Sequence, residues 1–576
     1  MSLFATMNLA NSALHAAQLN VSVAGHNIAN ADRPGFSRQR VEQSALYRRS
    51  TAFGQQGFGV SVTGISRIRN EFIDIQIRRQ SHELGRHQAI DHALESMENI
   101  VREPSDSGIM EFMNRFFNSW DFLVNNADDM AARTSVFSSA EMLVGVFRNI
   151  SSELHTLKTS RNNELIANVG EVNNIAREIF NLNTEISLAA AGGGVANDSL
   201  DRRDILMRRL AEFTDFNAVT DSTGQVSISI SGHILVSAVS VNSIELFADN
   251  NAPADATGFI PFGLRMATGG GILEPTGGRI RGLIDARDIF IPAMEGQLDE
   301  LVRGFVTAVN NQHREGFNLR GHTGFNFFDP NGLTARTISV SQTIATDVSN
   351  IAAAGGGGAM SGIIRNTIMD PPGMPSVGTP FLLSNIDGSN GWNSGDPDSA
   401  RGFNLVNGTV VVTTNPGGVA LIENQDFKVD YVLGTVQLLG DVNGNNIYEG
   451  QSLSISFRHH TGNFTGVGNN ENALAISQLR TAAILGSVNM QGNPNSTIGE
   501  FYGNLIARLG LDRREAVANV ETRQFLIDGY DEHQDCIAGV SLDEEAANII
   551  RFQHSYQAAA RIFSAVQSML DTLLNL

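Results

Sequence analysis

The first thirty residues carry a regular apolar pattern and no charged side chain. Apolar positions alternate at intervals of four and three residues, a period of 3.5 that predicts an α-helix with one apolar seam. The segment from Asn30 to Gly35 predicts the end of this helix, because Pro34 lacks an amide hydrogen and glycine favours a turn. The seam residues are Leu3, Met7, Ala10, Leu14, Ala17, Val21, Ala24 and Ile28.

The end of the chain repeats this spacing. Ser541, with Glu544 three residues later, forms a capping box that predicts the start of a second helix. Asp543 and Glu545 favour the same start, because acidic side chains stabilise the positive end of the helix dipole. The seam at this end comprises Ile549, Phe552, Tyr556, Ala559, Phe563, Val566, Leu570 and Leu573.

Two interpretations of these seams are open. Ordinary amphipathic helices buried in one globular core would show them. The N-terminal seam is rich in alanine, however, and buries little against a single partner, whereas a whole leucine or phenylalanine contributes about 1.5–3 kcal/mol. Its outer faces carry asparagine, glutamine and serine, which suit packing among neighbouring chains better than open water. We therefore predict that the terminal helices pair with each other in a coiled coil and then pack against other subunits.

Long helices are predicted for much of the middle of the chain. Residues 71–190, about 283–315, 471–486 and 498–535 show helical period, and Leu200 to Phe213 predicts a short helix with a polar face. Two apolar stripes in these helices are interpreted as core rather than as a cofactor site. They are Ile109, Phe112, Met113, Phe116, Trp120, Leu123 and Val124, and Leu298, Leu301, Val302, Phe305 and Val309.

A period of two replaces the helical period elsewhere. Apolar residues alternate with serines from Val226 to Ile230 and from Ser452 to Phe457, and clusters of glycine, asparagine and proline mark turns. The predicted fold class is α+β, with paired terminal helices, a long-helix bundle and β-rich outer parts inserted between them. The predicted domains are a terminal coiled-coil assembly domain (1–70 with 536–576), a helical bundle (71–215 with 281–316 and 466–535) and β-rich outer parts (216–280 and 317–465).

Composition and charge exclude several classes of protein. The chain has 576 residues, 42% of them hydrophobic and 17% charged, which suits several packed cores. It contains no run of about eighteen apolar residues, so we expect no membrane span. The net charge of −20 argues against a nucleic-acid partner. Residues 1–80 nevertheless carry a net charge of +5, which leaves −25 for the other 496 residues and permits attraction between copies.

Candidate metal sites are weak. His82-Glu83 followed by His87 is close to the zinc-protease pattern, but the second histidine comes at i+5 instead of i+4 and lies on another helix face. A surface site on His87 and Asp91 is conceivable, although a solvated helix face is preferred. The segment 441–452 begins like a calcium loop, yet asparagine and serine occupy the sixth and twelfth positions, so an Asn-Gly hairpin turn is preferred.

Candidate nucleotide and nucleophile sites are weaker still. Neither of the two lysines, Lys158 and Lys428, lies in a phosphate-loop context. The glycine run 355–358 lacks dinucleotide-binding spacing and predicts a loop. The lone cysteine, Cys536, excludes an intramolecular disulfide and is interpreted as a small apolar filler in a helix. We therefore predict no enzyme, no cofactor and no bound metal.

Motifs at both ends resemble a known family. The stretch 22–41 resembles the N-terminal signature of bacterial flagellar rod, hook and hook-associated proteins, with His26 in place of the first asparagine. The C-terminal stretches 539–548, 556–561 and 571–576 look like the matching signature. The segment from Arg115 to Trp120 and the residues that follow Phe36 are similar to the hook-associated protein 1 family of the hook–filament junction. The motif residues are Asn27, Ile28, Ala29, Asn30, Pro34, Gly35, Phe36, Ser37 and Arg38, and Leu542, Asp543, Glu544 and Glu545.

The resemblance implies a structural subunit of a tubular polymer, with the terminal helices at its axis. It implies as partners further copies of the chain, the hook protein, the next hook-associated protein, flagellin, and an export chaperone at the C-terminal helix. It also implies type III export without a cleaved signal, and a place in the extracellular flagellum, or in the periplasm where the flagella are periplasmic. Two alternatives stay open: a hook or distal rod subunit, and an adhesin or hydrolase carried by residues 330–460.

Overall fold

The computed structural model describes residues 3–51, 54–248, 258–355, 466–486 and 494–574, and between 356 and 465 only short strands and positions 421, 423 and 439. The chain divides into two compact units: Met1–Ser96 with Leu157–Phe290 and Leu511–Leu576, and Met97–Thr156 with Ile291–Gly510. Three helices, α2 (Glu71–Val101), α4 (Met130–Ala191) and α10 (Ile498–Ala538), contribute to both. Long helices with small antiparallel sheets confirm the predicted α+β class. The predicted domain limits stay a prediction.

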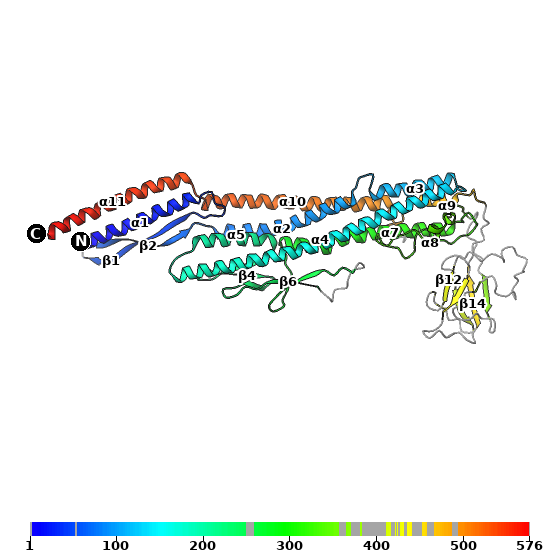
Figure 1. The fold of residues 1–576 in the computed structure, drawn as a ribbon, viewed down its shortest axis with the longest axis horizontal. Helices are drawn as coiled ribbons and strands as arrows, with labels where there is room; N and C mark the ends of the chain where they lie inside the picture. The colour runs from blue at the N-terminus through cyan, green and yellow to red at the C-terminus, as the bar shows by residue number, and fades with distance from the viewer. Residues whose placement is uncertain are drawn as a thin grey trace, which may run out of the picture. The chain divides into compact units, whose positions relative to one another are not determined.

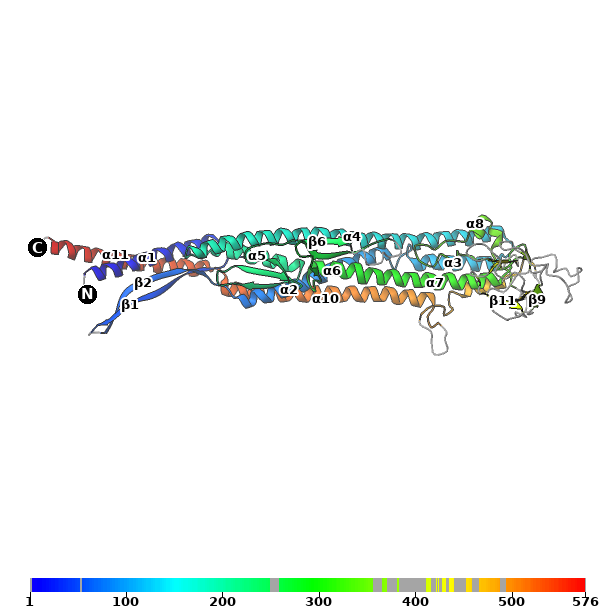
Figure 2. The ribbon, with the colours of Figure 1, turned by 90° about the horizontal axis from the view of Figure 1, so that it is seen from below.

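The two ends of the chain pair as antiparallel helices in the first unit. α1 (Leu3–Ala29) packs along α11 (Leu542–Leu574), and the two termini lie at the same end of the pair (Figures 1 and 2). A long antiparallel hairpin of β1 (Gln39–Thr51) and β2 (Gly54–Arg67) also contacts α1. There the Val60 amide donates a hydrogen bond to the Ser12 hydroxyl at 3.3 Å. The terminal part therefore contains a β-ribbon that the sequence pattern does not predict.

Local chemistry explains where these helices begin and end. The Glu544 amide donates to the Ser541 hydroxyl oxygen at 3.4 Å, so serine caps α11 as predicted. At the end of α1, the Asn30 amide donates to the carbonyls of His26 and Asn27 at 3.2 Å. Gly35 then adopts a φ of 76°, a left-handed conformation that favours glycine and reverses the chain.

The core of the first unit lies between α4, two further helices and two small sheets. The helices are α5 (Asn197–Phe213) and α6 (Gly278–Asp285), and both sheets are antiparallel, with orders β3-β4-β5 and β6-β7-β8. Val226, Ile228 and Ile230 are buried while Ser227 is exposed, which confirms the predicted alternation. The strands are β3 (Asn217–Thr220), β4 (Val226–Ile230), β5 (His233–Val236), β6 (Ile244–Ala248), β7 (Phe262–Met266) and β8 (Ile272–Leu273).

The core of the second unit is aromatic. It gathers side chains of α3 (Ile109–Asn125), α7 (Ile291–Glu315) and the segment that follows α7, and Phe327 and Phe328 stack edge to face at 4.9 Å. The predicted stripes are core residues, although Phe112 and Val124 are only half-buried. The fully buried members are Ile109, Met113, Phe116, Trp120 and Leu123 on α3, and Leu298, Leu301, Val302, Phe305 and Val309 on α7.

A neutral histidine closes this second core. Nδ1 of His313 donates to the Phe325 carbonyl at 2.7 Å, and its Nε2 accepts from the Ala352 amide at 2.9 Å. An imidazolium cannot accept the second bond, so this geometry requires the neutral ring. Burial lowers the pKa of His313 to about 4.

Short strands between 365 and 457 form two antiparallel sheets of the second unit, with orders β10-β13-β12 and β11-β14-β9. Positions 356–358 and 441–451, which carry the predicted glycine loop and calcium-like loop, lie outside the described residues. The strands are β9 (Arg365–Met369), β10 (Phe381–Leu382), β11 (Val411–Asn415), β12 (Phe427–Asp430), β13 (Thr435–Leu438) and β14 (Ser452–Phe457).

Several predicted elements differ from the structure. From Phe317 to Gly355 the chain forms isolated bridges, α8 (Gln342–Thr346) and a 3₁₀ turn (Val348–Asn350) instead of strands. The helix predicted for 283–315 is divided by a π-helical turn, Ala286–Phe290, between α6 and α7. α9 (Glu471–Gln478) ends well before the predicted limit at residue 486. Among the described residues, no helix combines the length and apolar character needed to cross a bilayer.

Candidate functional site

The N-terminal seam lies on a helix that is covered from two sides. Ala10, Ala17 and Ala24 are buried, and the other seam residues of α1 are half-buried. Because α1 contacts both α11 and the β1–β2 hairpin, its small side chains allow close approach of neighbouring backbones. Glycine on β2 continues this arrangement, since a Cβ at Gly59 would lie 2.2 Å from the Ser12 hydroxyl.

The C-terminal seam is less completely covered. Ala559 and Val566 are buried, whereas Ile549, Phe552, Phe563 and Leu570 are half-buried. Tyr556 remains 44% exposed, and it shares a hollow between the helices with Val21. The side chain of Leu573 lies outside the described residues. The two seams therefore contribute to the contact between α1 and α11, and their role in assembly between copies stays a prediction.

The turn after α1 is held to its own helix by a buried asparagine. The Asn27 side chain donates to the Gln39 carbonyl at 2.9 Å and accepts from the Gln39 amide at 3.0 Å. Asn30 donates from its side chain to the His26 carbonyl at 2.9 Å, and the His26 ring meets Phe36 edge to face at 5.6 Å. These contacts close the segment from Asn27 to Gln39 into a compact turn at the start of β1.

Close packing explains the small residue in this turn. A Cβ added to Gly35 would lie 2.6 Å from the Ile205 side chain of α5. Arg33 and Pro34 are exposed at the tip, while Ile28 is half-buried and Ala29 is the last residue of α1. Gly35 thus allows both the left-handed backbone conformation of the turn and its close contact with α5.

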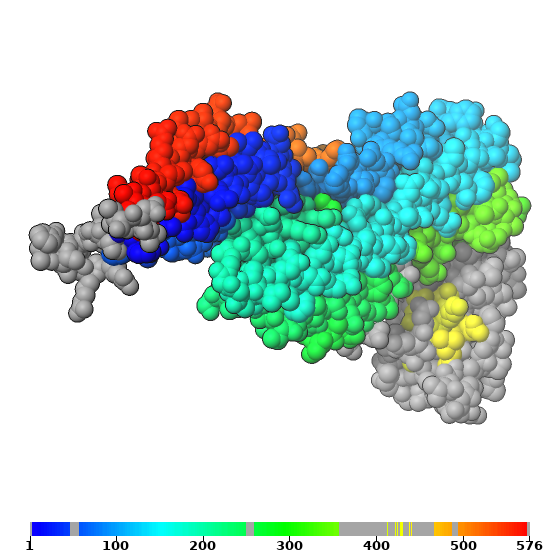
Figure 3. Space-filling model, turned by 60° about the vertical axis from the view of Figure 1, so that its left-hand side comes forward, coloured from blue at the N-terminus to red at the C-terminus, as the bar shows by residue number. Residues whose placement is uncertain are grey.

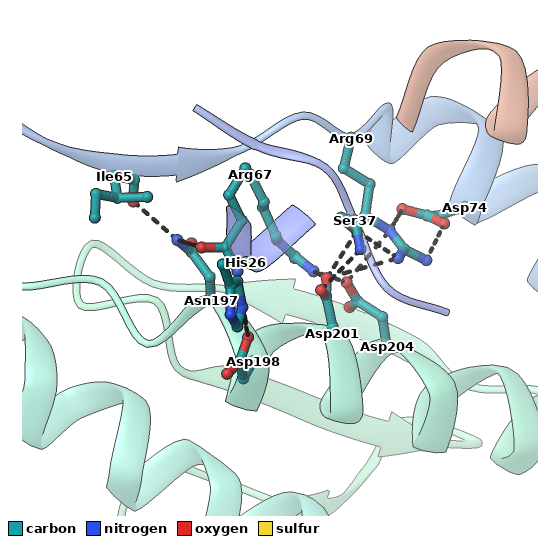
Figure 4. Close-up of polar contacts among 11 residues, drawn as sticks. His26, Ser37, Ile65, Arg67, Arg69, Asp74, Asn197, Asp198, Asp201 and Asp204 are labelled. Carbon is teal, nitrogen blue, oxygen red and sulfur yellow. Dashed lines mark hydrogen bonds and ion pairs between the residues drawn. The ribbon is translucent and has the colours of Figure 1, made fainter. Parts of the chain in front are cut away.

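A buried polar cluster joins this turn to α5. The Asp201 carboxylate accepts from the amide of Ser37 at 2.9 Å and from its hydroxyl at 2.7 Å (Figure 4). One guanidinium nitrogen of Arg67 donates to Asp201 at 2.8 Å and to Asp204 at 2.6 Å. Both carboxylates are more than nine-tenths buried, so these charge-assisted bonds are made away from water.

A second arginine extends the cluster to α2. Arg69 donates to both oxygens of Asp74, at 2.7 and 2.8 Å, and to the Ser37 hydroxyl at 3.2 Å (Figure 4). Burial works to lower the pKa of Arg69, but the hydrogen bonds to Asp74 and the charges of Asp204, Asp74 and Asp201 raise it overall. Asn197 adds a hydrogen bond to the Ile65 carbonyl of β2 at 2.9 Å. The cluster therefore connects α2, α5 and both ends of the hairpin.

Arg38 joins the N-terminal motif to the C-terminal motif. Its guanidinium lies 3.0 Å from Glu544 and 2.7 Å from Glu545, and its amide donates to the Ala538 carbonyl at 2.9 Å. Glu545 is buried, whereas Leu542 and Asp543 at the start of α11 are exposed. Two sequence motifs separated by more than 500 residues thus form one contact.

Reasoning from sequence missed six of the ten polar residues that join the turn to α2, α5 and α11. It identified Ser37, Arg38, Glu544 and Glu545 as motif residues, without a partner for any of them. It noted the polar face of α5 but did not assign it a function. The missed residues are Arg67, Arg69, Asp74, Asn197, Asp201 and Asp204. The available signal was the repeated Asp at i and i+3 of α5, opposite an arginine-rich N-terminal segment.

The residues considered for metal or nucleophile chemistry have other partners. Nδ1 of His82 lies 3.0 Å from the Thr214 carbonyl, and His87 lies 3.9 Å from Glu83. Asp91 lies 3.6 Å from Arg513. Within the described ranges, no three potential metal ligands gather. Cys536 is exposed near the end of α10, so its interpretation as an apolar filler is wrong.

Comparison with known proteins agrees with the motifs. Residues 94–328 match the family "Flagellar hook-associated protein FlgK helical domain", and residues 537–576 match "Flagellar basal body rod FlgEFG protein C-terminal". Flagellar hook-associated protein 1 of Bacillus subtilis is 25% identical, over 100% of this chain and 98% of the relative. The Salmonella typhimurium protein of the same name is 24% identical, over 99% of each.

A solved structure shows a similar fold. The flagellar hook junction protein FlgK from Burkholderia pseudomallei superposes with a TM-score of 0.55 at 17% identity, covering 81% of this chain and 100% of that one. Full-length similarity, the helical-domain match and the paired terminal motifs agree with one another. The chain belongs to the flagellar hook-associated protein 1 family, whose members are non-enzymatic structural proteins of the flagellar hook–filament junction.

Proposed function

We propose that copies of this chain assemble side by side through α1 and α11 and so connect the hook to the filament. The observation that supports this most directly is the uncovered apolar surface of α11. Four large non-aromatic apolar side chains on this helix are 43–57% exposed, although α1 already covers the neighbouring face. They are Leu542, Ile550, Ile562 and Met569. Figure 3 shows α11 (red) lying along α1 (blue).

The free energy that burial of these four side chains would contribute to assembly can be worked out. Burying a whole large apolar side chain stabilises by about 1.5–3 kcal/mol, so burying the exposed half of four such chains contributes about 3–6 kcal/mol per copy. Each copy in a closed ring or helical layer makes the contact twice, once with each neighbour. That repetition supports a stable layer built from individually modest contacts.

The polar cluster around Asp201 gives the assembly its geometry. A coiled coil alone leaves the terminal helices free to swing about the turn at Gly35. The ion pairs of Arg67, Arg69 and Arg38 hold that turn to α2, α5 and α11 of the same unit. Charged, hydrogen-bonded contacts specify one orientation more sharply than apolar packing does.

The partners follow from this location. The hook protein would contact one side of the layer, and the next hook-associated protein, and through it flagellin, the other. Before export, a chaperone would cover α11, because this helix carries the exposed apolar side chains. The seam residues on both terminal helices would then be protected until assembly.

Electron microscopy tests the proposal. Purified protein is added to isolated hooks that lack this subunit, followed by flagellin and its cap protein. Decoration of the distal hook tip and subsequent filament growth are expected. Failure to bind hook tips, or lengthening of the hook itself, would contradict the proposal and favour a rod or hook subunit.

A further inference from the structure

One face of α10 in the first unit is exposed and contains a large aromatic side chain. Phe525 is 76% exposed and Leu511 is 60% exposed, whereas Ala516 and Ile527 are buried on the opposite face. Exposed positions at the centre of this face recur at intervals of four, three and four residues, the spacing that a partner helix covers in a coiled coil. We call these positions the α10 stripe, and they are Glu521, Phe525, Asp528 and Glu532.

The α10 stripe lies in acidic surroundings. The exposed residues between positions 515 and 535 include five carboxylates and neither lysine nor arginine. Within the described residues, the carboxylates of the stripe form no ion pair, although Asp528 accepts a hydrogen bond from Gln524 at 2.7 Å. Uncompensated negative charge around an exposed aromatic ring favours a basic partner with room for that ring. The five carboxylates are those of Glu515, Glu521, Asp528, Glu532 and Asp535.

The face of α11 that α1 leaves uncovered has the opposite charge. Residues 546–570 include two arginines and neither aspartate nor glutamate. Both arginines are exposed, and neither forms an ion pair within the part of the chain that the structure describes. An exposed histidine and an exposed alanine lie between them, so that the four positions recur at intervals of three, four and three residues. We call these positions the α11 stripe, and they are Arg551, His554, Ala558 and Arg561.

The two stripes complement each other when the helices run antiparallel. At about 1.5 Å per residue, the α10 stripe is about 16.5 Å long and the α11 stripe about 15 Å, so all four levels coincide. Two levels then join a carboxylate to an arginine, one joins a carboxylate to a histidine, and the Phe525 ring meets the smallest side chain. A parallel arrangement would place Asp528 opposite the alanine and so remove one polar pair. The antiparallel pairs are Glu521 with Arg561, Phe525 with Ala558, Asp528 with His554, and Glu532 with Arg551.

A second copy can supply this partner without disturbing the fold of either chain. Within one chain, α11 could reach its own α10 only by reversing at the linker 539–541. That reversal would break the contacts of Arg38 with Glu544 and Glu545 and separate α11 from α1. Because the α11 stripe lies on the face that α1 leaves uncovered, the α10 of a second copy can cover it while these contacts remain.

We propose that α11 of one copy packs antiparallel on the α10 stripe of a second copy, where Phe525 becomes buried and its flanking carboxylates pair with the arginines of the α11 stripe. The contact joins two different surfaces, so it repeats in one direction from copy to copy. Ile550 and Ile562 flank the α11 stripe, so the same contact covers part of the exposed apolar surface of α11. The inference rests on the proposed assembly and identifies the surface that receives α11.

Cysteine cross-linking in assembled flagella tests the antiparallel register. Asp528→Cys and His554→Cys are combined with Cys536→Ser, so that the two thiols of the chain lie at one proposed pair. Flagella carrying this chain are isolated, oxidised and run on non-reducing gels. A disulfide needs Cα atoms closer than about 7 Å, so we expect dimers and higher multiples of the chain.

The matched control replaces His554→Cys with Ala565→Cys. Ala565 lies on the same exposed face about 16 Å farther along α11, so this control should give at least tenfold fewer cross-linked chains. Incorporation of the His554→Cys chain without cross-linking above the control would overturn the proposal. A disulfide confined to the monomer would also overturn it, because it would show that α11 folds back on its own α10.

Exchanging two opposite charges provides a second test that needs no cross-link. Glu521→Arg and Arg561→Glu each place like charges opposite one another, and each should lower the amount of chain in isolated flagella at least tenfold. The two substitutions combined in one chain should restore it to within about threefold of the parent, because the pair is re-formed with reversed signs. Both side chains are exposed, so circular dichroism of the purified variants should match the parent.

Normal incorporation of both single variants, or no recovery in the combined variant, would contradict the inference. Absence of the unaltered chain from flagella would instead refute the proposed function. The two failures are therefore distinguishable.

Discussion

Removing the Asp201 carboxylate tests whether the polar cluster holds the turn after α1. In Asp201→Ala, three charge-assisted hydrogen bonds are lost, two from Ser37 and one from Arg67. Arg67 keeps its bond to Asp204, and the Ser37 hydroxyl keeps Arg69 as a donor. The Ser37 amide, however, is left buried without any acceptor.

The size of the effect follows from these contacts. Hydrogen bonds to charged groups contribute about 1.5–3 kcal/mol each, and breaking a buried ion pair by removing one partner costs about 3–5 kcal/mol. Because Arg67 retains Asp204 as an acceptor and the Ser37 hydroxyl still accepts from Arg69, we expect the free energy of opening this segment to fall by about 3 kcal/mol. That change corresponds to about a hundredfold loss of protection from hydrogen exchange.

Native-state hydrogen exchange read by mass spectrometry measures this opening directly, on peptides that contain Ser37 and the hairpin start. A global melting curve is less suitable, because a chain of two compact units need not unfold in one step. Asp198→Ala is the matched control: this neighbouring carboxylate is 59% exposed and accepts one hydrogen bond from Gln39 at 3.2 Å. Protection at Ser37 within about threefold of the parent, or equal effects of the two variants, would refute the reasoning.

Three further predictions concern other parts of the molecule. Between pH 6.5 and 4 the free energy of unfolding of the second unit should decrease by up to about 3 kcal/mol as pH falls, because His313 is protonated near pH 6.5 in the unfolded chain and only near 4 in the folded chain. Urea midpoints followed by Trp120 fluorescence in a Trp392→Phe background should show this pH dependence, and His313→Gln should abolish it. Gly35→Ala should destabilise the turn by about 1–3 kcal/mol through its positive φ and the contact with Ile205, seen as faster proteolysis there, and unchanged proteolysis would contradict the strain. Ala24→Asp should abolish binding to hook tips, because it buries a charge in the apolar seam of α1. Ser22→Asp, on the exposed face of α1, should still bind, and equal binding of both variants would contradict a role of the seam in assembly.

Periodicity could predict the long elements because helix geometry is local. The stripes on α3 and α7 need only the residues of their own helix to be recognised, and their core positions are confirmed. The serine cap of α11 and the stop after Asn30 likewise depend on neighbouring backbone groups. Membership of a flagellar family rested on such local motifs as well.

The hairpin escaped prediction for a physical reason. Its register shifts three times, after Glu42, Ala45 and Arg48, and each shift interrupts the alternation that marks a strand. Much of the ribbon is half-buried or exposed, so no continuous apolar face marks it in the sequence. Similarly, the π-helical turn before α7 leaves the apolar spacing nearly helical and is therefore hidden in the sequence pattern.

The sequence by itself determined the apolar seams of the terminal helices, the end of α1, the start of α11, the core stripes and the family. Only the tertiary structure decided which charged residues meet: Ser37 contacts Asp201 across 164 positions, and Arg38 contacts Glu545 across 507. An arginine has many carboxylates available along an acidic chain, and the residues next to it in the sequence do not show which carboxylate it contacts. The packed helices determine the pairing, because they bring one arginine and one carboxylate together and exclude water from them. Only then do the hydrogen bonds outweigh the cost of burying the charges.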